Sequence, residues 1–204
     1  MLNLRPAVGR VVAPLAATLL RLGVTPDMVT VTGTVGAVVA AFAFFPRGSF
    51  FLGTAFVTLA VLTDALDGAM ARLRGLGGPW GAFLDSTLDR IADAAIFSAL
   101  ALWYAGRGDS RLLLCVTLFC LVSGIVTSYA KARAEGLGMT CNVGIAERTE
   151  RLILVLAGTL LAGLGLRQGL PVALWVLAVA STITVGQRLV EVRRQAVPAA
   201  PPAR

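Results

Sequence analysis

Long apolar runs dominate this chain, and short segments with Gly, Pro or charged residues separate them. A membrane-spanning helix needs about 20 mostly apolar residues. Six stretches qualify, at about 26–45, 50–73, 81–105, 111–132, 150–166 and 170–189. Gly and Pro in the connections are turn signals. The pattern predicts an all-α integral membrane protein with six transmembrane helices.

The two ends of the chain follow a different pattern. The apolar run Val11–Leu20 is too short to span a bilayer, contains Pro14 and has arginines on both sides. We therefore expect residues 1–22 to form an amphipathic juxtamembrane helix that lies in the membrane interface; a cleaved signal peptide is the alternative. The membrane domain is expected over 23–195, and the Pro/Ala-rich tail 196–204 is expected to be disordered.

The composition agrees with this pattern. Hydrophobic residues make up 57% of the chain and charged residues 14%, whereas soluble domains carry about 25% charged residues. A soluble domain and a disordered chain are both excluded. The net charge of +7 does not indicate nucleic-acid binding, because no soluble fold is available to carry a basic patch. The chain has no His, which removes the usual neutral-pH base.

The basic residues predict the orientation of the helices. If the N-terminus is cytoplasmic and six helices alternate, thirteen of the eighteen Lys and Arg residues fall on the cytoplasmic side: Arg5, Arg10, Arg21, Arg72, Arg74, Lys131, Arg133, Arg148, Arg151, Arg188, Arg193, Arg194 and Arg204. The positive-inside rule then places both termini in the cytoplasm. We expect a multi-pass protein of the cytoplasmic (inner) cell membrane.

Five aspartates lie within predicted spans two and three: Asp64, Asp67, Asp85, Asp89 and Asp93. Acids at that depth are costly and point to a functional site. The first two are three residues apart and the next two are four apart, so each pair shares a helix face. Because the two helices are joined by a short loop, the pairs can converge at their cytoplasmic ends. Four carboxylates at one point repel each other, and Mg²⁺, Mn²⁺ or Ca²⁺ would resolve the repulsion.

Small residues and one arginine accompany these acids. Gly68, Ala71 and Gly81 share their faces and leave room for a ligand, and Arg72 could neutralise a phosphate oxygen. Metal ions together with Arg suit displacement at phosphorus. The small residues alone are also typical of membrane helix packing, and intramembrane acids also occur in cation- or proton-coupled transporters.

Residues 64–89 contain Asp64, Asp67, Gly68, Ala71 and Arg72, then, after eight residues, Gly81, Asp85 and Asp89. This arrangement resembles the signature of the CDP-alcohol phosphatidyltransferase family, D-x2-D-G-x2-A-R-x8-G-x3-D-x3-D, at every fixed position. The six-helix membrane fold of that family agrees with the pattern of the whole chain.

The resemblance implies a reaction in which an alcohol hydroxyl attacks the lipid-linked β-phosphorus of a CDP-linked lipid and CMP leaves. It implies that Asp64, Asp67 and Asp85 are metal ligands and that Asp89 is the general base, which can also contact metal. Mg²⁺ is the expected cofactor, with Mn²⁺ possible, and a homodimer is the expected assembly. For Asp93, which lies outside the signature, a site role and a helix-packing role remain open.

The same resemblance implies that the CDP-lipid is bound by two groups of residues: Gly68, Ala71, Arg72 and Gly81 of the signature, and Pro26, Asp27 and Thr30 at the start of the first span. The residues also allow a simpler interpretation of that second segment. Thr25 as N-cap and Pro26 at the first helical position are typical of a helix start.

The acceptor must be inferred from other residues. Arg clusters on the expected active-site side favour an anionic, phosphorylated acceptor, although positive-inside anchoring explains any one of them equally well. Segments 83–90, 128–133 and 147–151 resemble the bacterial phosphatidylinositol phosphate synthases within the family. The residues expected to bind the acceptor phosphate are Ser128, Lys131, Arg148, Arg151 and Arg188.

We therefore expect phosphatidyl transfer from CDP-diacylglycerol to inositol 1-phosphate, which gives phosphatidylinositol phosphate and CMP. The alternative within the family is phosphatidylglycerophosphate synthase, which uses glycerol 3-phosphate. A cation- or proton-coupled transporter is the alternative from another class, but it would not need the fixed Gly, Ala and Arg positions. The expected partners are membrane lipids and the two substrates.

Overall fold

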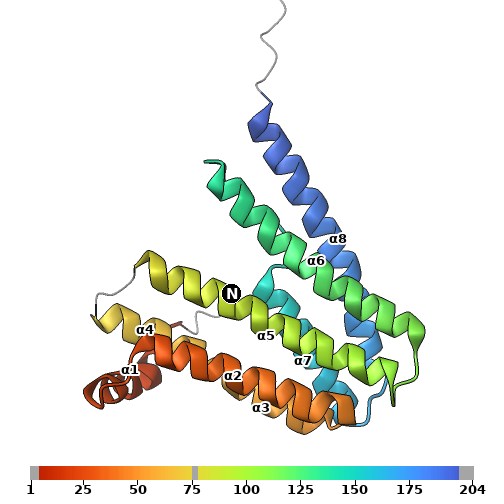
Figure 1. Cartoon of the computed structure of the whole chain (residues 1–204), viewed down its shortest axis with the longest axis horizontal. Coiled ribbons are helices and arrows are strands. Elements are labelled where there is room, and N and C mark those ends of the chain that lie inside the picture. Colours follow the sequence, from red (N-terminus) through yellow and green to blue (C-terminus); the bar gives the residue numbers. More distant parts are fainter. Residues whose placement is uncertain (1–4, 75–77, 198–204) are drawn as a thin grey trace, which may run out of the picture. The chain divides into compact units, whose positions relative to one another are not determined.

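The computed structural model describes residues 5–74 and 78–197, except the side chains of residues 5–12, 64, 65 and 74. Within these ranges the chain is helical and contains no β-strand (Figure 1). It divides into two compact units, residues 1–99 and 100–204. Of the predicted disordered tail, 196–204, residue 196 is the last residue of a helix, and residues 198–204 lie outside the described residues.

The first unit contains four helices, a 3-10 turn and most of a fifth helix. They are α1 (Arg5–Arg21), α2 (Pro26–Phe44), η1 (Phe45–Arg47), α3 (Phe50–Leu62), α4 (Asp64–Arg74) and α5 (Pro79–Ala105), whose last residues belong to the second unit. α2 packs against α3 and α4, and α1 packs against α4. A Cβ at Gly33 of α2 would lie 2.0 Å from Oγ1 of Thr63. Glycine therefore permits the close approach of α2 to the α3–α4 junction.

The start of α2 confirms the predicted helix start. The Thr25 side chain accepts a hydrogen bond from the backbone N–H of Met28 at 3.2 Å, and Pro26 occupies the first helical position. Proline suits this position because its missing N–H would have no partner within the helix. Asp27 lies in the first turn, where the helix dipole stabilises negative charge.

The second predicted span, 50–73, is interrupted at Thr63 and forms two helices, α3 and α4. The Thr63 hydroxyl donates to the Ala60 carbonyl at 2.6 Å, and its own carbonyl accepts from the N–H groups of Leu66 and Asp67. Thr63 keeps right-handed helical dihedrals, so the interruption does not reverse the chain. The result is a new helix N-terminus that begins at Asp64, where acidic residues are favoured.

The second unit contains the end of α5 together with α6 (Arg111–Gly136), α7 (Arg148–Gly163) and α8 (Gly169–Ala196). α8 runs alongside α6 (Figure 1) and also packs against α7. A Cβ at Gly158 of α7 would lie 2.6 Å from Cβ of Ala173 on α8. The fourth predicted span was expected to end near Lys131, whereas α6 continues to Gly136.

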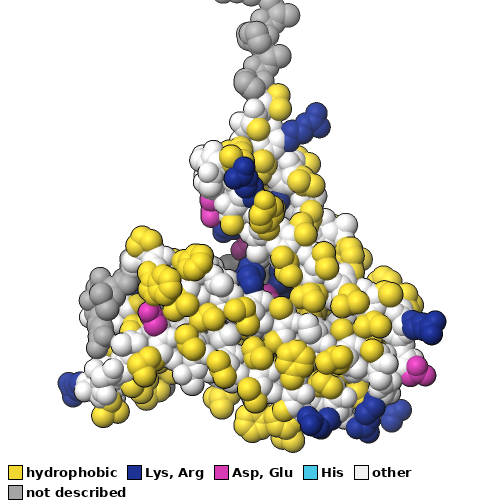
Figure 2. Space-filling view, viewed as in Figure 1, with side chains coloured by type: hydrophobic (Ala, Val, Ile, Leu, Met, Phe, Trp, Pro, Cys, Tyr) yellow, Lys and Arg dark blue, Asp and Glu magenta, His cyan; other side chains and the backbone are white. Residues whose placement is uncertain are grey.

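By length and composition, four stretches of the described chain could cross a membrane: Pro26–Arg47, Phe50–Leu73, Arg111–Gly136 and Gly169–Ala196. Two of the six predicted spans are not among them. α5 is long enough but carries four charged residues between positions 85 and 93. α7, with 16 residues, extends only about 24 Å at 1.5 Å per residue. Exposed hydrophobic side chains cover much of the face in Figure 2.

Candidate active site

In the first unit, Asp67 of α4 is held by a residue of α2. Its carboxylate is buried, with 7% of the residue exposed, and accepts a hydrogen bond from Oγ1 of Thr30 at 2.5 Å. The Thr30 oxygen also lies 3.1 Å from the Pro26 carbonyl. A hydroxyl has one proton, and the closer, charged acceptor is the stronger partner. Thr30, predicted on the nucleotide side, therefore orients a predicted metal ligand.

Three more acids follow one another on α5 at intervals of four residues. Asp85 is exposed, and Asp93 is buried. The Asp89 side chain is 14% exposed, and its Oδ2 lies 3.6 Å from Nη2 of Arg90. Asp89 is thus partly shielded from solvent and forms an ion pair with the neighbouring Arg90.

Within the set of side chains that the structure describes, no three His, Cys, Asp or Glu residues lie close enough together to hold a metal ion. The side chain of Asp64 is outside that set. The remaining predicted ligands are all carboxylates, which are the donors that Mg²⁺ and Mn²⁺ prefer. The four-aspartate metal site therefore stays a prediction.

The small residues of the signature leave open space beside these acids. A Cβ at Gly81 would have no described heavy atom within 4 Å, and a Cβ at Gly68 would meet Nη1 of Arg72 at 3.4 Å. Arg72 is exposed and Ala71 is half-buried. The guanidinium of Arg72 therefore extends over Gly68 and is accessible to an anionic ligand.

The start of α5 is connected to the start of α2 by a contact that the sequence did not predict. Nε1 of Trp80 donates to Oδ2 of Asp27 at 3.0 Å, across 53 residues of sequence. The Trp80 ring also contacts Phe83, with ring centroids 6.1 Å apart. Asp27, predicted to bind the CDP-lipid, is thus held next to the segment that precedes the signature glycine Gly81.

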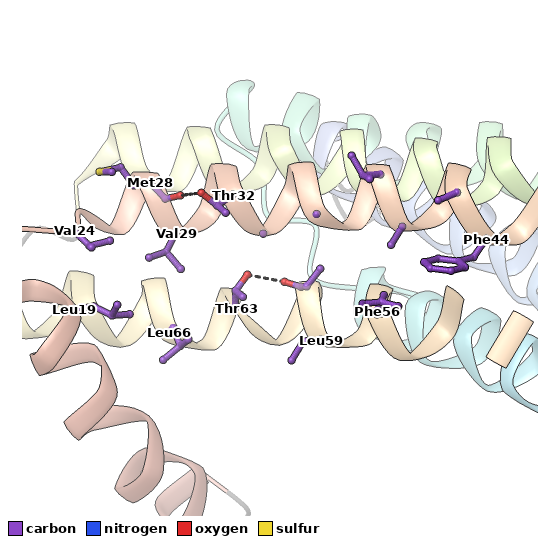
Figure 3. Close-up of a pocket in the computed structure, with 16 residues that line it drawn as sticks. Leu19, Val24, Met28, Val29, Thr32, Phe44, Phe56, Leu59, Thr63 and Leu66 are labelled. Atoms are coloured by element: carbon purple, nitrogen blue, oxygen red, sulfur yellow. Dashed lines mark hydrogen bonds between the residues drawn. The ribbon is translucent and has the colours of Figure 1, made fainter. Parts of the chain in front are cut away.

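An apolar groove of about 730 Å³ opens along α2 in the first unit (Figure 3). Its lining runs from Met28 to Phe44 on α2 and is completed from the other side by Phe56, Leu59 and residues near Thr63. Sixteen residues of helix correspond to about 24 Å. Two of the lining residues, Val29 and Leu66, directly precede Thr30 and Asp67 in the sequence, so one end of the groove lies beside these two residues.

In the second unit, Arg188 of α8 connects three segments. The residue is 3% exposed. Its guanidinium donates to the carbonyl of Val143 at 2.9 Å, to the carbonyl of Thr127 at 2.5 Å and to Oε1 of Glu147 at 3.1 Å. The structure thus gives Arg188 a role in holding α6 and the segment before α7, and its role as an acceptor ligand stays a prediction.

Two other predicted acceptor residues come together at one backbone atom. The carbonyl of Gly124 on α6 accepts from Oγ of Ser128 and from Nη1 of Arg151, both at 3.1 Å. Arg151 is 3% exposed. Lys131, one turn beyond Ser128, and Arg148, at the start of α7, are both half-buried.

Comparisons with known proteins agree with the family that the signature in residues 64–89 resembles. The sequence model of the CDP-alcohol phosphatidyltransferase family matches residues 23–187. A phosphatidylinositol phosphate synthase of Streptomyces avermitilis is 52% identical over 197 residues, which cover 93% of this chain and 81% of the relative.

Solved structures of the Mycobacterium tuberculosis phosphatidylinositol phosphate synthase are similar to more than nine-tenths of this chain. A crystal structure of that protein with CDP-DAG bound has a TM-score of 0.89 and 46% identity, and the match covers 94% of this chain and 99% of that one. A second, in complex with manganese and citrate, has a TM-score of 0.88 and 46% identity, with 93% of each chain covered.

Proposed function

Because this chain belongs to the CDP-alcohol phosphatidyltransferase family, we propose that it transfers the phosphatidyl group of CDP-diacylglycerol to inositol 1-phosphate. The products would be phosphatidylinositol phosphate and CMP. The observation that carries this proposal is the 52% identity to a phosphatidylinositol phosphate synthase over 93% of the chain. The match covers the C-terminal half, which contains the predicted acceptor residues, as well as the N-terminal half, which contains the signature.

The chemistry is a displacement at phosphorus. A hydroxyl oxygen of the acceptor attacks the lipid-linked phosphorus and forms a new P–O bond, while the bond to the bridging oxygen breaks and CMP leaves with that oxygen. The hydroxyl proton passes to the carboxylate of Asp89. The partial burial of Asp89 and its pairing with Arg90 at 3.6 Å support this role, because a positioned carboxylate can act as general base.

We assign Asp64, Asp67, Asp85 and Asp89 as ligands of a divalent cation, Mg²⁺ first and Mn²⁺ second. The manganese in the structure of the relative supports a divalent metal. When bound, the metal would neutralise charge on the diphosphate and orient the reacting oxygens. Thr30 supports the assignment of Asp67, since metal-ligating carboxylates are themselves usually hydrogen-bonded.

The CDP-lipid would be bound by residues of both segments identified in the sequence: Pro26, Asp27, Thr30, Gly68, Ala71, Arg72 and Gly81. Arg72 is exposed above Gly68 and can pair with a phosphate oxygen. The apolar groove along α2 (Figure 3) is suited to one acyl chain of this lipid, because it is open, apolar and adjacent at one end to Thr30 and Asp67.

We assign the acceptor phosphate to Ser128, Lys131, Arg148, Arg151 and Arg188. Arg151 suits this role because its planar guanidinium, which donates to the Gly124 carbonyl at 3.1 Å, has the geometry for bidentate recognition of a phosphate. For Arg188, three of its N–H groups donate to protein oxygens, so its contribution to the phosphate would come from the others.

We further propose six membrane spans over 23–195, with α5 and α7 completing the four stretches that qualify by composition. α1 would lie in the membrane interface, both termini and the active site would face the cytoplasm, and the protein would act as a homodimer in the inner membrane. The distribution of the basic residues supports this orientation.

An acceptor panel tests the proposed function. The purified protein, in detergent with CDP-diacylglycerol and Mg²⁺, is given inositol 1-phosphate, inositol, glycerol 3-phosphate or serine, and CMP release is measured. Inositol 1-phosphate is expected to give the highest kcat/KM. Preference for glycerol 3-phosphate would identify a phosphatidylglycerophosphate synthase instead. If none of the four acceptors leads to CMP release, the proposed reaction is contradicted. Removing the metal with EDTA is expected to abolish turnover, and Mg²⁺ or Mn²⁺ to restore it.

A further inference from the structure

Gly124 lies inside α6 at the point where two predicted acceptor residues meet. Its carbonyl accepts hydrogen bonds from Ser128, one turn later on the same helix, and from Arg151 of α7. The backbone of Gly124 therefore fixes the relative position of a hydroxyl and a guanidinium.

The missing side chain of Gly124 is the second observation. A Cβ at this position would lie 2.6 Å from Cζ, 2.7 Å from Nη2 and 2.8 Å from Nη1 of Arg151. All three close atoms belong to the guanidinium, which therefore lies directly against the Gly124 backbone. Ordinary van der Waals contact begins near 3.4 Å, so any side chain at position 124 would displace this group.

We propose that Gly124 is a positioning residue for acceptor binding: its carbonyl and its bare Cα form the seat of the Arg151 guanidinium. This inference rests on the proposed function, because it takes Arg151 as a ligand of the acceptor phosphate. Bidentate recognition of a phosphate depends on the orientation of the planar guanidinium. The residue at position 124 thus controls affinity for the phosphorylated acceptor without contacting it.

The geometry also predicts that Gly124→Ala leaves the fold intact. The atoms that would clash are the far end of a long, flexible side chain, so a rotamer change of Arg151 can relieve the clash without a shift of the backbone. Alanine also has a higher helix propensity than glycine, which favours the substituted helix. The effect of the substitution should therefore appear in acceptor binding and not in thermal stability.

The test compares Gly124→Ala with Gly186→Ala, the same substitution inside α8, where an added Cβ has no described atom within 4 Å. For each variant and the unmodified enzyme, kcat and the KM of both substrates are measured in the CMP-release assay. Gly124→Ala is expected to raise the KM for inositol 1-phosphate by roughly 10- to 100-fold, because small displacements of a positioning group can cost that much. The KM for CDP-diacylglycerol, the thermal midpoint and all constants of Gly186→Ala are expected to stay near those of the unmodified enzyme.

Arg151→Lys provides a second, independent measurement. Lysine has no planar guanidinium to seat, so Gly124→Ala should have little further effect on acceptor KM in the Arg151→Lys background. Such non-additivity is the signature of two residues that act through one contact. Fully additive effects would overturn the proposal.

The remaining outcomes also decide the question. An unchanged acceptor KM in Gly124→Ala, equal rises in both KM values, or failure of Gly124→Ala to fold would each overturn the proposed seat. If the unmodified enzyme releases no CMP with inositol 1-phosphate, the proposed function fails. If the unmodified enzyme releases CMP with inositol 1-phosphate and Gly124→Ala has the same kinetic constants, the proposed function stands and only the positioning role of Gly124 is overturned.

Discussion

Thr30 and Asp67 illustrate how single residues of this enzyme cooperate. Their side chains lie on different helices, 37 residues apart in sequence, and meet in a buried hydrogen bond of 2.5 Å. A buried carboxylate is costly unless it is paired or hydrogen-bonded. The Thr30 proton satisfies one oxygen of Asp67, and it also fixes the orientation of the carboxylate that we propose as a metal ligand.

We predict that Thr30→Val weakens metal binding. Valine keeps the shape of threonine but lacks the hydroxyl, so Asp67 loses the hydrogen bond from position 30. Loss of such supporting hydrogen bonds typically costs 10- to 100-fold in metal affinity or activity. The Mg²⁺ concentration for half-maximal CMP release is expected to rise by roughly that factor, and Thr30→Ser is expected to restore it.

The matched control for this prediction is Thr117→Val in α6, where the hydroxyl bonds the Leu113 carbonyl of its own helix. Its Mg²⁺ dependence is expected to match that of the unmodified enzyme. An unchanged Mg²⁺ requirement in Thr30→Val would show that Thr30 does not support a metal ligand.

At the scale of elements, α8 holds the segment between α6 and α7 by two residues on one face. Oγ1 of Thr184 accepts from the N–H groups of Ile145 and Ala146 at 3.2 and 3.0 Å. One turn later, Arg188 binds the Val143 carbonyl and Glu147. Gly144, with φ +146°, packs closely against Thr184, since a Cβ at Gly144 would lie 2.6 Å from Cγ2 of Thr184. α8 therefore determines where α7, with Arg148 and Arg151, begins.

We predict that Thr184→Val destabilises this segment. Valine cannot accept a hydrogen bond, so the N–H groups of Ile145 and Ala146 lose their acceptor, at a cost of about 1–3 kcal/mol. The thermal midpoint in detergent is expected to fall, and the KM for the phosphorylated acceptor is expected to rise because the start of α7 becomes less well fixed. Thr182→Val is the control, since Thr182 is an exposed residue whose hydroxyl donates to the Ala178 carbonyl of its own helix. A Thr184→Val protein with an unchanged thermal midpoint would contradict the proposed role of this residue.

At the scale of the whole molecule, the apolar surface and the distribution of charge determine where the protein can reside. Large hydrophobic side chains are exposed along α2, α3, α6 and α8. Such a surface is stable in lipid and would aggregate in water. In the six-span topology that we propose, the loop at 106–110 would lie outside the cell and the end of α8 would lie inside.

This topology predicts the labelling of single cysteines. In a background with Cys115, Cys120 and Cys141 replaced by Ser, Arg107→Cys should react with a membrane-impermeant maleimide in intact protoplasts. Arg193→Cys, the same substitution at an exposed position near the end of α8, should react only after the membrane is opened. Labelling of Arg193→Cys in intact protoplasts would contradict the cytoplasmic placement of the C-terminus.

The sequence by itself determined the helical class, most helix positions, the start of α2 at Thr25 and Pro26, and the family. These properties are local: runs of apolar residues, turn residues and the spacing of eight signature positions all lie within short segments. It did not predict the interruption at Thr63, although an acid directly after a threonine is typical of a helix N-terminus.

Only the tertiary structure decided which distant residues meet. Thr30 contacts Asp67, Trp80 donates to Asp27 across 53 residues, and Arg188 donates to Thr127 across 61. Such contacts depend on how far each helix is rotated about its axis and how closely its neighbour approaches. Local periodicity leaves both open, because glycines such as Gly33 and Gly124 permit approaches that only the packed neighbours reveal.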